Sequence, residues 1–494
     1  MQTQRVIFLF LVFLFGLNRA QTQEQASKQG TPPSRLEIDQ LQADVLALQE
    51  QLDGAGLQRM AVPWTFGAQY RVMGNASNFA WHPTSITNDE ETRSFINQRF
   101  RTWVAFSPSE QVEGYLQMEV GHVGWGEDHE GTKNYDVAGD AVGIELRRGF
   151  LTYKSQHAGA FRVGIQDWHD AFGESATLGS SDAVDDYDSF GAILANSVWD
   201  FNVGGVSWSQ TFPSAAGLSL NGGVFQLWEG TDSRADDTYL FGLDADVSSG
   251  KANESFGASF YFLSDRGNYS YPGAAPYASS WDAWFGLRLT KSIGAIPLRG
   301  WVISNTGRCN NLSDDDFSHT GFAGKLEAFD LEVGRGRFSA QVLYASGDDN
   351  PSDHTSHEFR TIAQSEADNF GAQGYWSYLA LSSPHGPSDV NDLGIGPQNQ
   401  GLGLATLQAK LAYPIADNFT GVAAIGWLAS AVDNPANGKR YIGTEVANTL
   451  NWDLGGGLNW SIGGAFLATG DFLSAAGSET DDLWEMFTRF QLEF

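Results

Sequence analysis

Residues 483–494 alternate strictly between apolar and polar side chains. One face carries Trp484, Met486, Phe490, Leu492 and Phe494, and the other carries Glu485, Arg489, Gln491 and Glu493. A period of two predicts a β-strand. An apolar face opposed to a charged one over about 10 residues is typical of a transmembrane β-barrel wall, which meets lipid outside and water inside.

The same alternation recurs along the chain and predicts about 18 strands. Their expected starts lie near Phe66, Arg99, Val112, Ile144, Phe161, Val198, Gly217, Thr238, Ser255, Trp281, Ile296, His319, Gly336, Leu402, Phe419, Tyr441, Leu458 and Leu483. An even count brings both ends of the chain to one side of the membrane, the periplasmic side. The predicted fold is therefore all-β: an antiparallel up-and-down transmembrane barrel over residues 64–494.

Connections between the predicted strands alternate between short and long. Short ones include 107–111, 155–159 and 292–295, and the long ones include 167–197 and 347–401. Short periplasmic turns and long extracellular loops alternate in this way in outer-membrane barrels. A soluble propeller or sandwich also has many short strands but gives no reason for the alternation. Residues 347–401 are a candidate plug or lid, because a connection of that length usually has a function.

The first 20 residues predict an export signal that directs the chain to the bacterial outer membrane. Arg5 provides a positive flank, Val6–Leu17 an apolar core, and Ala20 a small residue at a cleavage point. This apolar stretch is shorter than the roughly 20 residues that a membrane-spanning helix needs.

A linker at 21–33 leads to a short helix predicted over 34–56. Its apolar positions follow a heptad spacing: Ile38, Leu41, Val45, Leu48 and Leu52. Two interpretations stay open. The segment is either a periplasmic coiled coil that forms a homotrimer or contacts the cell wall, or an amphipathic helix that lies against the barrel rim.

The composition gives a net charge of −30, 57 glycines and a single cysteine, Cys309. Acidic residues concentrate between the predicted strands, as in Asp185, Asp186 and Asp188, whereas many arginines lie within strands. The acidic clusters are solvated loop charge, since none has the spacing and central glycine of a calcium loop. We expect no metal, no cofactor and no nucleic-acid partner, because no phosphate-binding loop, zinc spacing or basic patch is present.

Once the apolar face of each strand is assigned to lipid, the opposite face lines the interior. Candidate pore-lining residues on that face are Arg71, Arg99, Arg101, Arg147, Arg162, Arg288, Arg299, Arg489 and Glu445. Rings of arginine favour anions, and the guanidinium fork matches carboxylate or phosphate. The alternative is that each arginine pairs with an acidic neighbour and stiffens the wall.

The segment 144–172, IELRRGFLTYKSQHAGAFRVGIQDWHDAF, resembles a hairpin of the alginate-export porins of the bacterial outer membrane. Three further stretches extend the resemblance, namely 346–361, 441–473 with its Gly443, Glu445, Gly470 and Asp471, and the aromatic C-terminus 487–494.

This resemblance implies an 18-strand monomeric barrel whose arginine-rich constriction passes anionic polysaccharide. The matching interior positions are Arg147 or Arg148, Arg162 and Glu445. The arginine of the family's Gly-Arg-Gln motif is replaced by Ile165, and a further basic position by Asp167. A general porin for sugars or small anions therefore remains an alternative.

Two other function classes compare less well with the sequence. An outer-membrane enzyme needs a nucleophile system or metal beside histidine, and the nine histidines lie outside any such motif. An envelope anchor would use the heptad segment but leaves the interior charges unexplained. The sequence thus favours a passive porin in contact with outer-membrane lipid, biased toward anionic or carbohydrate solutes.

Overall fold

The computed structural model describes residues 62–78, 92–124, 144–169, 200–213, 217–228, 237–248, 254–266, 277–311, 316–350, 354–362, 395–474 and 481–494. The chain divides into two compact units, 1–62 and 63–494. The predicted export signal, the linker and the heptad helix lie outside the described residues. No helix in the described ranges is long and apolar enough to span a bilayer.

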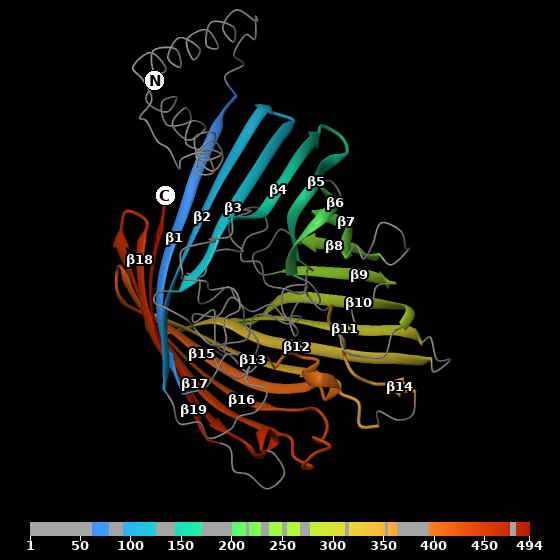
Figure 1. Cartoon of the computed structure of the whole chain (residues 1–494), viewed down its shortest axis with the longest axis vertical. Helices are drawn as coiled ribbons and strands as arrows, with labels where there is room; N and C mark the ends of the chain where they lie inside the picture. The colour runs from blue at the N-terminus through green and yellow to red at the C-terminus, as the bar shows by residue number, and fades with distance from the viewer. Residues whose placement is uncertain are drawn as a thin grey trace, which may run out of the picture. The chain divides into compact units, whose positions relative to one another are not determined.

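The second unit is an antiparallel barrel of eighteen strands (Figure 1). The strands are β1 (Trp64–Ser77), β2 (Arg93–Ser109), β3 (Val112–Gly124), β4 (Ile144–Ser155), β5 (Gly159–His169), β6 (Asp200–Phe212), β7 (Leu218–Trp228), β8 (Thr238–Ser248), β9 (Ser255–Asp265), β10 (Tyr277–Ile293), β11 (Ile296–Asn311), β12 (Phe317–Val333), β13 (Gly336–Ala345), β15 (Leu404–Ala416), β16 (Phe419–Ala429), β17 (Tyr441–Gly455), β18 (Leu458–Thr469) and β19 (Leu483–Glu493). The predicted strand number and antiparallel order are confirmed.

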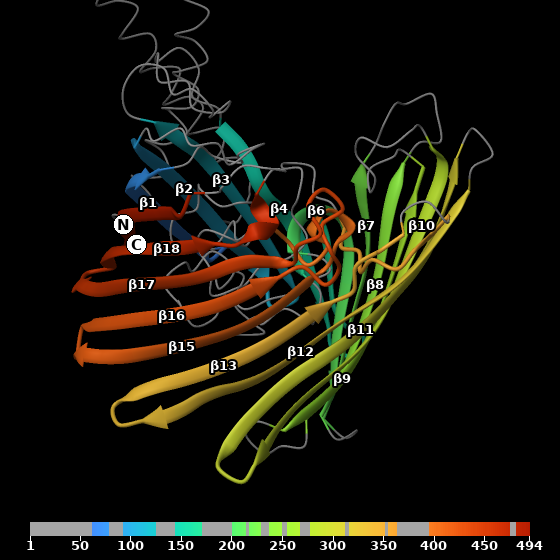
Figure 2. The same cartoon turned by 90° about the horizontal axis from the view of Figure 1, so that it is seen from below.

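Each strand pairs with its neighbours in sequence order, and β1 pairs with β19 to close the sheet. The closing register runs from Gln69 opposite Glu493 to Ser77 opposite Glu485. Closure leaves no free strand edge, so every strand has a hydrogen-bonding partner on both sides. Figure 2 shows β15 to β18 on one side of this barrel and β7 to β10 on another.

Every second connection is short, with two to six residues between the strands, as at 156–158, 294–295 and 334–335, and the others are mostly longer. The predicted alternation is confirmed. The start predicted near Arg99 is wrong by six residues, because the register of β1 and β2 continues from Arg71 opposite Arg99 to Ser77 opposite Arg93. The extension contains polar residues such as Asn75 and Ser77, so the alternation of apolar and polar side chains does not predict it.

Two short elements inside the longest connection were not predicted. The strand β14 (Thr355–Ser356) pairs in parallel with Ser318 and His319 of β12. The 3-10 helix η2 (Asn399–Gly401) precedes β15, and a similar turn, η3 (Asp471–Leu473), follows β18. Elements of two or three residues have no periodic pattern of their own, so the sequence gives no signal for them.

Apolar and polar residues separate across the wall as the alternation predicts. On β6, Val206 is 50% exposed on the outer face, and the next residue, Ser207, donates a hydrogen bond to Gln166 on the inner face. Exposed Phe285, Leu287 and Leu289 form the outer face of β10 in the same way. Large apolar side chains exposed in this pattern are stable only against lipid.

We expect Val206→Lys to destabilise the barrel by about 2–4 kcal/mol, because it places a charge in hydrocarbon near the middle of a strand. Ser209→Lys is the matched control, since Ser209 lies three residues further along β6 on the interior face and is also exposed. Urea unfolding in lipid vesicles measures both. Equal losses of unfolding free energy in the two variants would contradict the assignment of faces.

Candidate functional site

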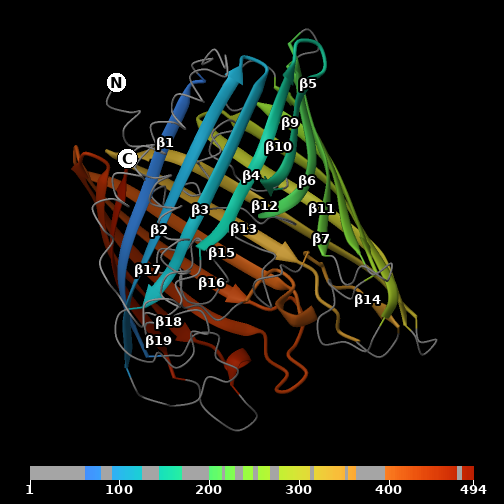
Figure 3. The ribbon, with the colours of Figure 1, turned by 45° about the horizontal axis from the view of Figure 1, so that its top comes forward.

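Seven arginines lie on the interior face of neighbouring strands on one side of the barrel. This set, called the arginine wall below, consists of Arg489 on β19, Arg71 on β1, Arg99 and Arg101 on β2, Arg147 and Arg148 on β4, and Arg162 on β5. The strands are contiguous because β19 pairs with β1. In Figure 3 the blue strands β1 to β3 of this wall cross in front of the yellow and orange strands of the opposite side of the barrel.

Two arginines of the wall are direct cross-strand partners. Arg71 pairs in register with Arg99, and both side chains are almost fully buried, at 1% and 2% exposed. Like charges directly opposite each other on a sheet destabilise it. Arg99 donates a hydrogen bond from Nη2 to Oε1 of Gln69 at 2.8 Å, which fixes its guanidinium but adds no negative charge. The barrel thus places two buried guanidinium groups next to each other on one interior face.

One carboxylate serves two arginines of the wall. Glu119 on β3 accepts a hydrogen bond from Nε of Arg101 at 2.5 Å and another from Nη1 of Arg147 at 3.0 Å, both at its Oε2. Its side chain is 8% exposed. Because Arg101 and Arg147 come from strands on either side of β3, Glu119 ties three strands together.

A β-bulge allows both arginines of the pair 147–148 to reach the interior. The register of β3 and β4 shifts between Gln117 and Met118, which face Arg148 and Leu146 and leave Arg147 as the extra residue. Leu146 is exposed on the outer face, Arg148 is buried, and Arg147 contacts Glu119. With a strict period of two, one of the two arginine side chains would face lipid. The bulge turns this side chain toward the interior.

Arg162 forms the end of the wall on β5. Its guanidinium carbon lies 4.2 Å from the ring centre of Phe150, and its Nη1 is 3.2 Å from Oδ1 of Asp167. Phe150 in turn stacks on Tyr115 with ring centres 5.2 Å apart. The guanidinium therefore lies over the ring of Phe150, a contact that guanidinium groups favour.

Two predicted pore-lining arginines, Arg288 on β10 and Arg299 on β11, lie outside the arginine wall and have carboxylate partners. We call the strands β8 to β12 the far wall. On β10, Nε of Arg288 donates to Oδ1 of Asp246 at 2.9 Å and its Nη1 lies 3.7 Å from Oδ1 of Asp244. On β11, Arg299 makes a bidentate pair with Glu327, with both N–O distances 2.8 Å. The structure therefore separates Arg288 and Arg299 from the arginine wall. Arg288 contacts two carboxylates, and Glu327 is shared by Arg299 and Lys325.

Glu445 lies on β17, which is not one of the strands that carry the arginine wall. It is 1% exposed on β17, with Gly426 and Leu467 as its cross-strand neighbours. The sequence motif that singled it out gives no indication of which strands lie beside it. The sequence suggested Arg148 only as an alternative to Arg147, but in the structure both residues belong to the arginine wall.

A buried histidine–carboxylate pair on the far wall was not among the predicted site residues. The imidazole of His319 on β12 forms an ion-pair contact with Asp282 on β10. Gly307 of β11 lies between them in register, and a Cβ there would come within 2.2 Å of Cε1 of His319. The glycine is what lets the imidazole cross the strand, so only the register reveals the pair.

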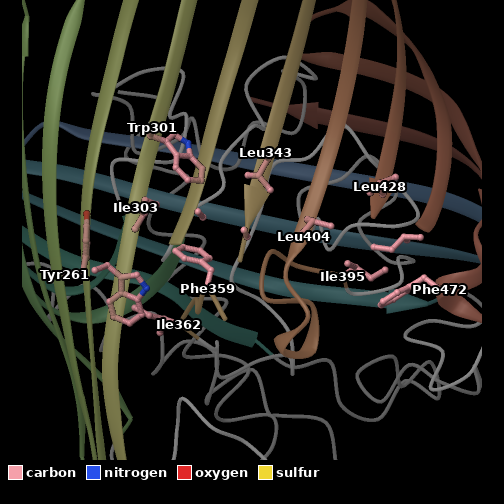
Figure 4. Close-up of a cluster of buried hydrophobic side chains, with 14 of the residues drawn as sticks. Tyr261, Trp301, Ile303, Leu343, Phe359, Ile362, Ile395, Leu404, Leu428 and Phe472 are labelled. Atoms are coloured by element: carbon pink, nitrogen blue, oxygen red, sulfur yellow. The ribbon is translucent and has the colours of Figure 1, made fainter. Parts of the chain in front are cut away.

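Both described ends of the long connection turn into the barrel. Figure 4 shows Phe359, Ile362 and Ile395 packed with wall residues in one apolar cluster. The wall side of the cluster includes Trp301, Ile303, Leu343, Leu404 and Leu428. We call residues 354–362 and 395–403 the inner arms. Their packing on interior side chains shows that part of the interior is occupied by the chain itself.

Hydrogen bonds from the wall fix the first inner arm. Nε1 of Trp284 donates to the carbonyl of Arg360 at 2.8 Å, and Oγ of Ser346 donates to the carbonyl of His357 at 2.7 Å. The backbone N–H of Phe359 donates to the carbonyl of Ser346 at 2.8 Å. Arg360 itself pairs with Glu358 at 3.3 Å. The arm is therefore attached at several points along its length.

Within the described ranges, no group of three or more His, Cys, Asp or Glu residues is arranged to hold a metal ion. The described interior side chains are mainly guanidinium, carboxylate, carboxamide and aromatic groups, with the imidazole of His319 and the ammonium of Lys325.

We expect Glu119→Gln to lower the unfolding free energy by about 3–5 kcal/mol, because it leaves buried Arg101 and part-buried Arg147 without their shared carboxylate. Glu113→Gln on the same strand is the control: Glu113 is 44% exposed and pairs with exposed Lys154, so its loss should cost less than about 1 kcal/mol. Urea unfolding in vesicles measures both values. If the two substitutions cost the same, Glu119 does not hold the wall together.

No family model matches the chain, and no curated protein matches it. Solved structures do match. A BenF-like porin from Pseudomonas fluorescens Pf-5 aligns with a TM-score of 0.50 at 10% identity, over 87% of this chain and 98% of that chain. OccAB1 of Acinetobacter baumannii aligns with a TM-score of 0.50 at 10% identity, over 87% and 97%. At this identity the likeness concerns the fold alone: the chain shares the β-barrel fold of these outer-membrane porins.

Proposed function

We propose that this protein is a passive outer-membrane channel that prefers small anionic solutes. The observation that carries the proposal is the arginine wall, which gathers seven guanidinium groups from five strands on one interior face. A water-filled lumen lined by arginine attracts anions and repels cations. Diffusion through it needs no cofactor and no conformational cycle.

The distribution of charge supports selectivity more than stiffening of the wall. On the far wall, Arg288 and Arg299 lie in tight pairs with Asp246 and Glu327. On the arginine wall, Arg71 faces Arg99 across strands, and one Glu119 serves two cations. At about 4 Å and an effective dielectric constant of about 20, one guanidinium attracts an anion by roughly 4 kcal/mol before desolvation. Small imbalances therefore suffice to bias permeation.

Carboxylates are the favoured solute class, because the guanidinium fork binds them in a bidentate way. Arg147 and Arg162 are the members of the wall whose side chains are open to such contact, at 20% and 31% exposed. A uronate oligosaccharide, as in alginate export, is the more specific candidate. The hairpin β4–β5, whose sequence resembles that family, contributes Arg147, Arg148 and Arg162 to the wall. The stacked pair Tyr115 and Phe150 lies beside them. A general porin without solute preference is the alternative.

The inner arms act, in this proposal, as a fixed constriction. Apolar packing and the hydrogen bonds to Trp284 and Ser346 attach them to β10–β13 and β15. Material that occupies one side of the interior directs solutes toward the other. The arms lie against β10–β13 and β15, which are not strands of the arginine wall. A solute would therefore pass along the arginine wall.

We expect the double substitution Arg71→Gln and Arg99→Gln to reduce the chloride-to-potassium permeability ratio. The reduction should be roughly tenfold, the change produced by losing about 1.4 kcal/mol of attraction. Reversal potentials in a potassium chloride gradient across a planar bilayer measure it. Arg337→Gln is the control, since its side chain is 62% exposed near a tight turn.

Three outcomes of that measurement separate the alternatives. A cation-selective wild-type channel would overturn the anion preference, and the absence of any open channel would favour an anchoring barrel. Oligouronate added to one side distinguishes the two solute classes, because a polyuronate channel shows transient current blocks with it. A neutral oligosaccharide of equal length should produce no such blocks.

We expect Trp284→Phe to loosen the first inner arm, because it removes the donor to the carbonyl of Arg360, a hydrogen bond of about 0.5–1.5 kcal/mol. Single-channel recordings should show more frequent excursions to a higher-conductance level. Trp281→Phe on the same strand is the control, since Trp281 is exposed on the outer face. Identical traces for wild type and Trp284→Phe would exclude a constriction held by this bond.

A further inference from the structure

Asn448 is a carboxamide on the lipid-facing side of the barrel. It lies in the middle of β17, where exposed Val446 and Leu450 occupy the same outer face on either side of it. The interior residues between them, Ala447 and Thr449, are buried. The alternation of burial along β17 therefore fixes the direction of the Asn448 side chain as outward.

Aromatic residues on both sides place Asn448 within the hydrocarbon band. Toward the periplasmic turns, the outer face carries stacked Trp452 and Trp460, and toward the other end it carries stacked Trp427 and Tyr441. Such rings mark the two membrane interfaces. Asn448 is four residues from Trp452, about 13 Å along a strand that rises about 3.3 Å per residue. Its carboxamide is thus in the apolar layer and away from either interface.

Three other polar side chains on this lipid-facing surface have partners within the wall. The hydroxyl of Tyr70 donates to Oε1 of Gln98 at 3.0 Å, and Nε1 of Trp460 donates to Oγ1 of Thr488 at 2.9 Å. Oγ1 of Thr102 donates to the carbonyl of Gly67 at 3.2 Å. This local pairing is what hydrocarbon surroundings require of a polar group.

Asn448 lacks such a partner among the described residues. Its cross-strand neighbours are Ala423 on β16 and Gly464 on β18, neither of which carries a polar side chain. A carboxamide has two N–H donors and one oxygen acceptor, and leaving them unsatisfied in an apolar medium is unfavourable. The missing hydrogen-bonding groups must come from outside this barrel.

We propose that a second copy of this chain docks on the outer face of β16–β18, with its own Asn448 against that of the first. Barrels in one membrane share an orientation, so a symmetric pair is related by a twofold axis along the membrane normal. A residue on that axis meets its own copy at the same depth. A carboxamide is complementary to itself, since each one donates an N–H to the oxygen of the other. The small neighbours Ala423 and Gly464 leave room for this approach.

Disulfide cross-linking tests the proposed contact directly. Asn448→Cys is made in a Cys309→Ser background, which removes the buried native thiol. The protein is oxidised in outer-membrane vesicles and analysed on non-reducing gels. Val302→Cys in the same background is the control, because Val302 is 59% exposed on the outer face of β11. We expect a cross-linked dimer from Asn448→Cys at a yield at least about ten times that of the control, and equal yields would overturn the proposal.

A second measurement uses the full-length chain without cysteine chemistry. Asn448→Leu removes the carboxamide and suits the lipid-facing environment, so the barrel should fold and retain its heat-modifiable migration. We expect the dimer fraction, measured by light scattering in mild detergent, to fall as the apparent dissociation constant rises about tenfold or more, which corresponds to about 1.4 kcal/mol. An unchanged dissociation constant, or a wild-type protein that is monomeric in membrane and detergent, contradicts a contact through Asn448.

Discussion

The structure depends on one constraint: within hydrocarbon, every backbone N–H and C=O must find its hydrogen bond inside the protein. An open sheet would leave two edges unsatisfied. The pairing of β1 with β19 removes both edges, and Ala68 and Phe494 exchange reciprocal backbone hydrogen bonds of 2.8 and 3.0 Å at the closure. Closure also creates an inside and an outside, so that alternate residues of one strand face different solvents.

The closure decides the electrostatics of the interior as well. Arg489 comes from the last strand, whereas Arg71 and Arg99 come from the first two, and they share one wall only because β19 lies beside β1. The strands opposite combine Arg288 and Arg299 with acidic partners. The two sides of one lumen therefore have different charge, although the whole chain carries a net charge of −30.

The inner arms bring apolar packing into a space that the alternation assigns to polar residues. Tyr261, Trp301, Ile303 and Leu343 face inward and would be unfavourable against water. Phe359, Ile362 and Ile395 cover them, so burial of apolar surface attaches the arms to the wall. The apolar residues that face inward on β9–β13 and β15 thus form the surface on which the ends of the long connection pack. Their burial against each other explains both the apolar wall residues and the position of the inner arms.

The sequence by itself determined the fold class, the strand number and the alternation of short turns with long connections. These follow from a period of two and from turn residues, which are local properties of the chain. It also identified which arginines face inward, since parity within a strand is local too. Parity failed at 147–148, where a bulge shifts the register by one residue.

Tertiary structure decided which interior residues lie side by side. Strand register decides that Arg71 faces Arg99 and that Arg101 and Arg147 share Glu119. It also decides that His319 contacts Asp282 across Gly307. Register is set by pairing between segments far apart in the sequence, and a single strand has no information about it. The inner arms and the exposed carboxamide of Asn448 have meaning only once the closed wall defines what is interior and what is lipid.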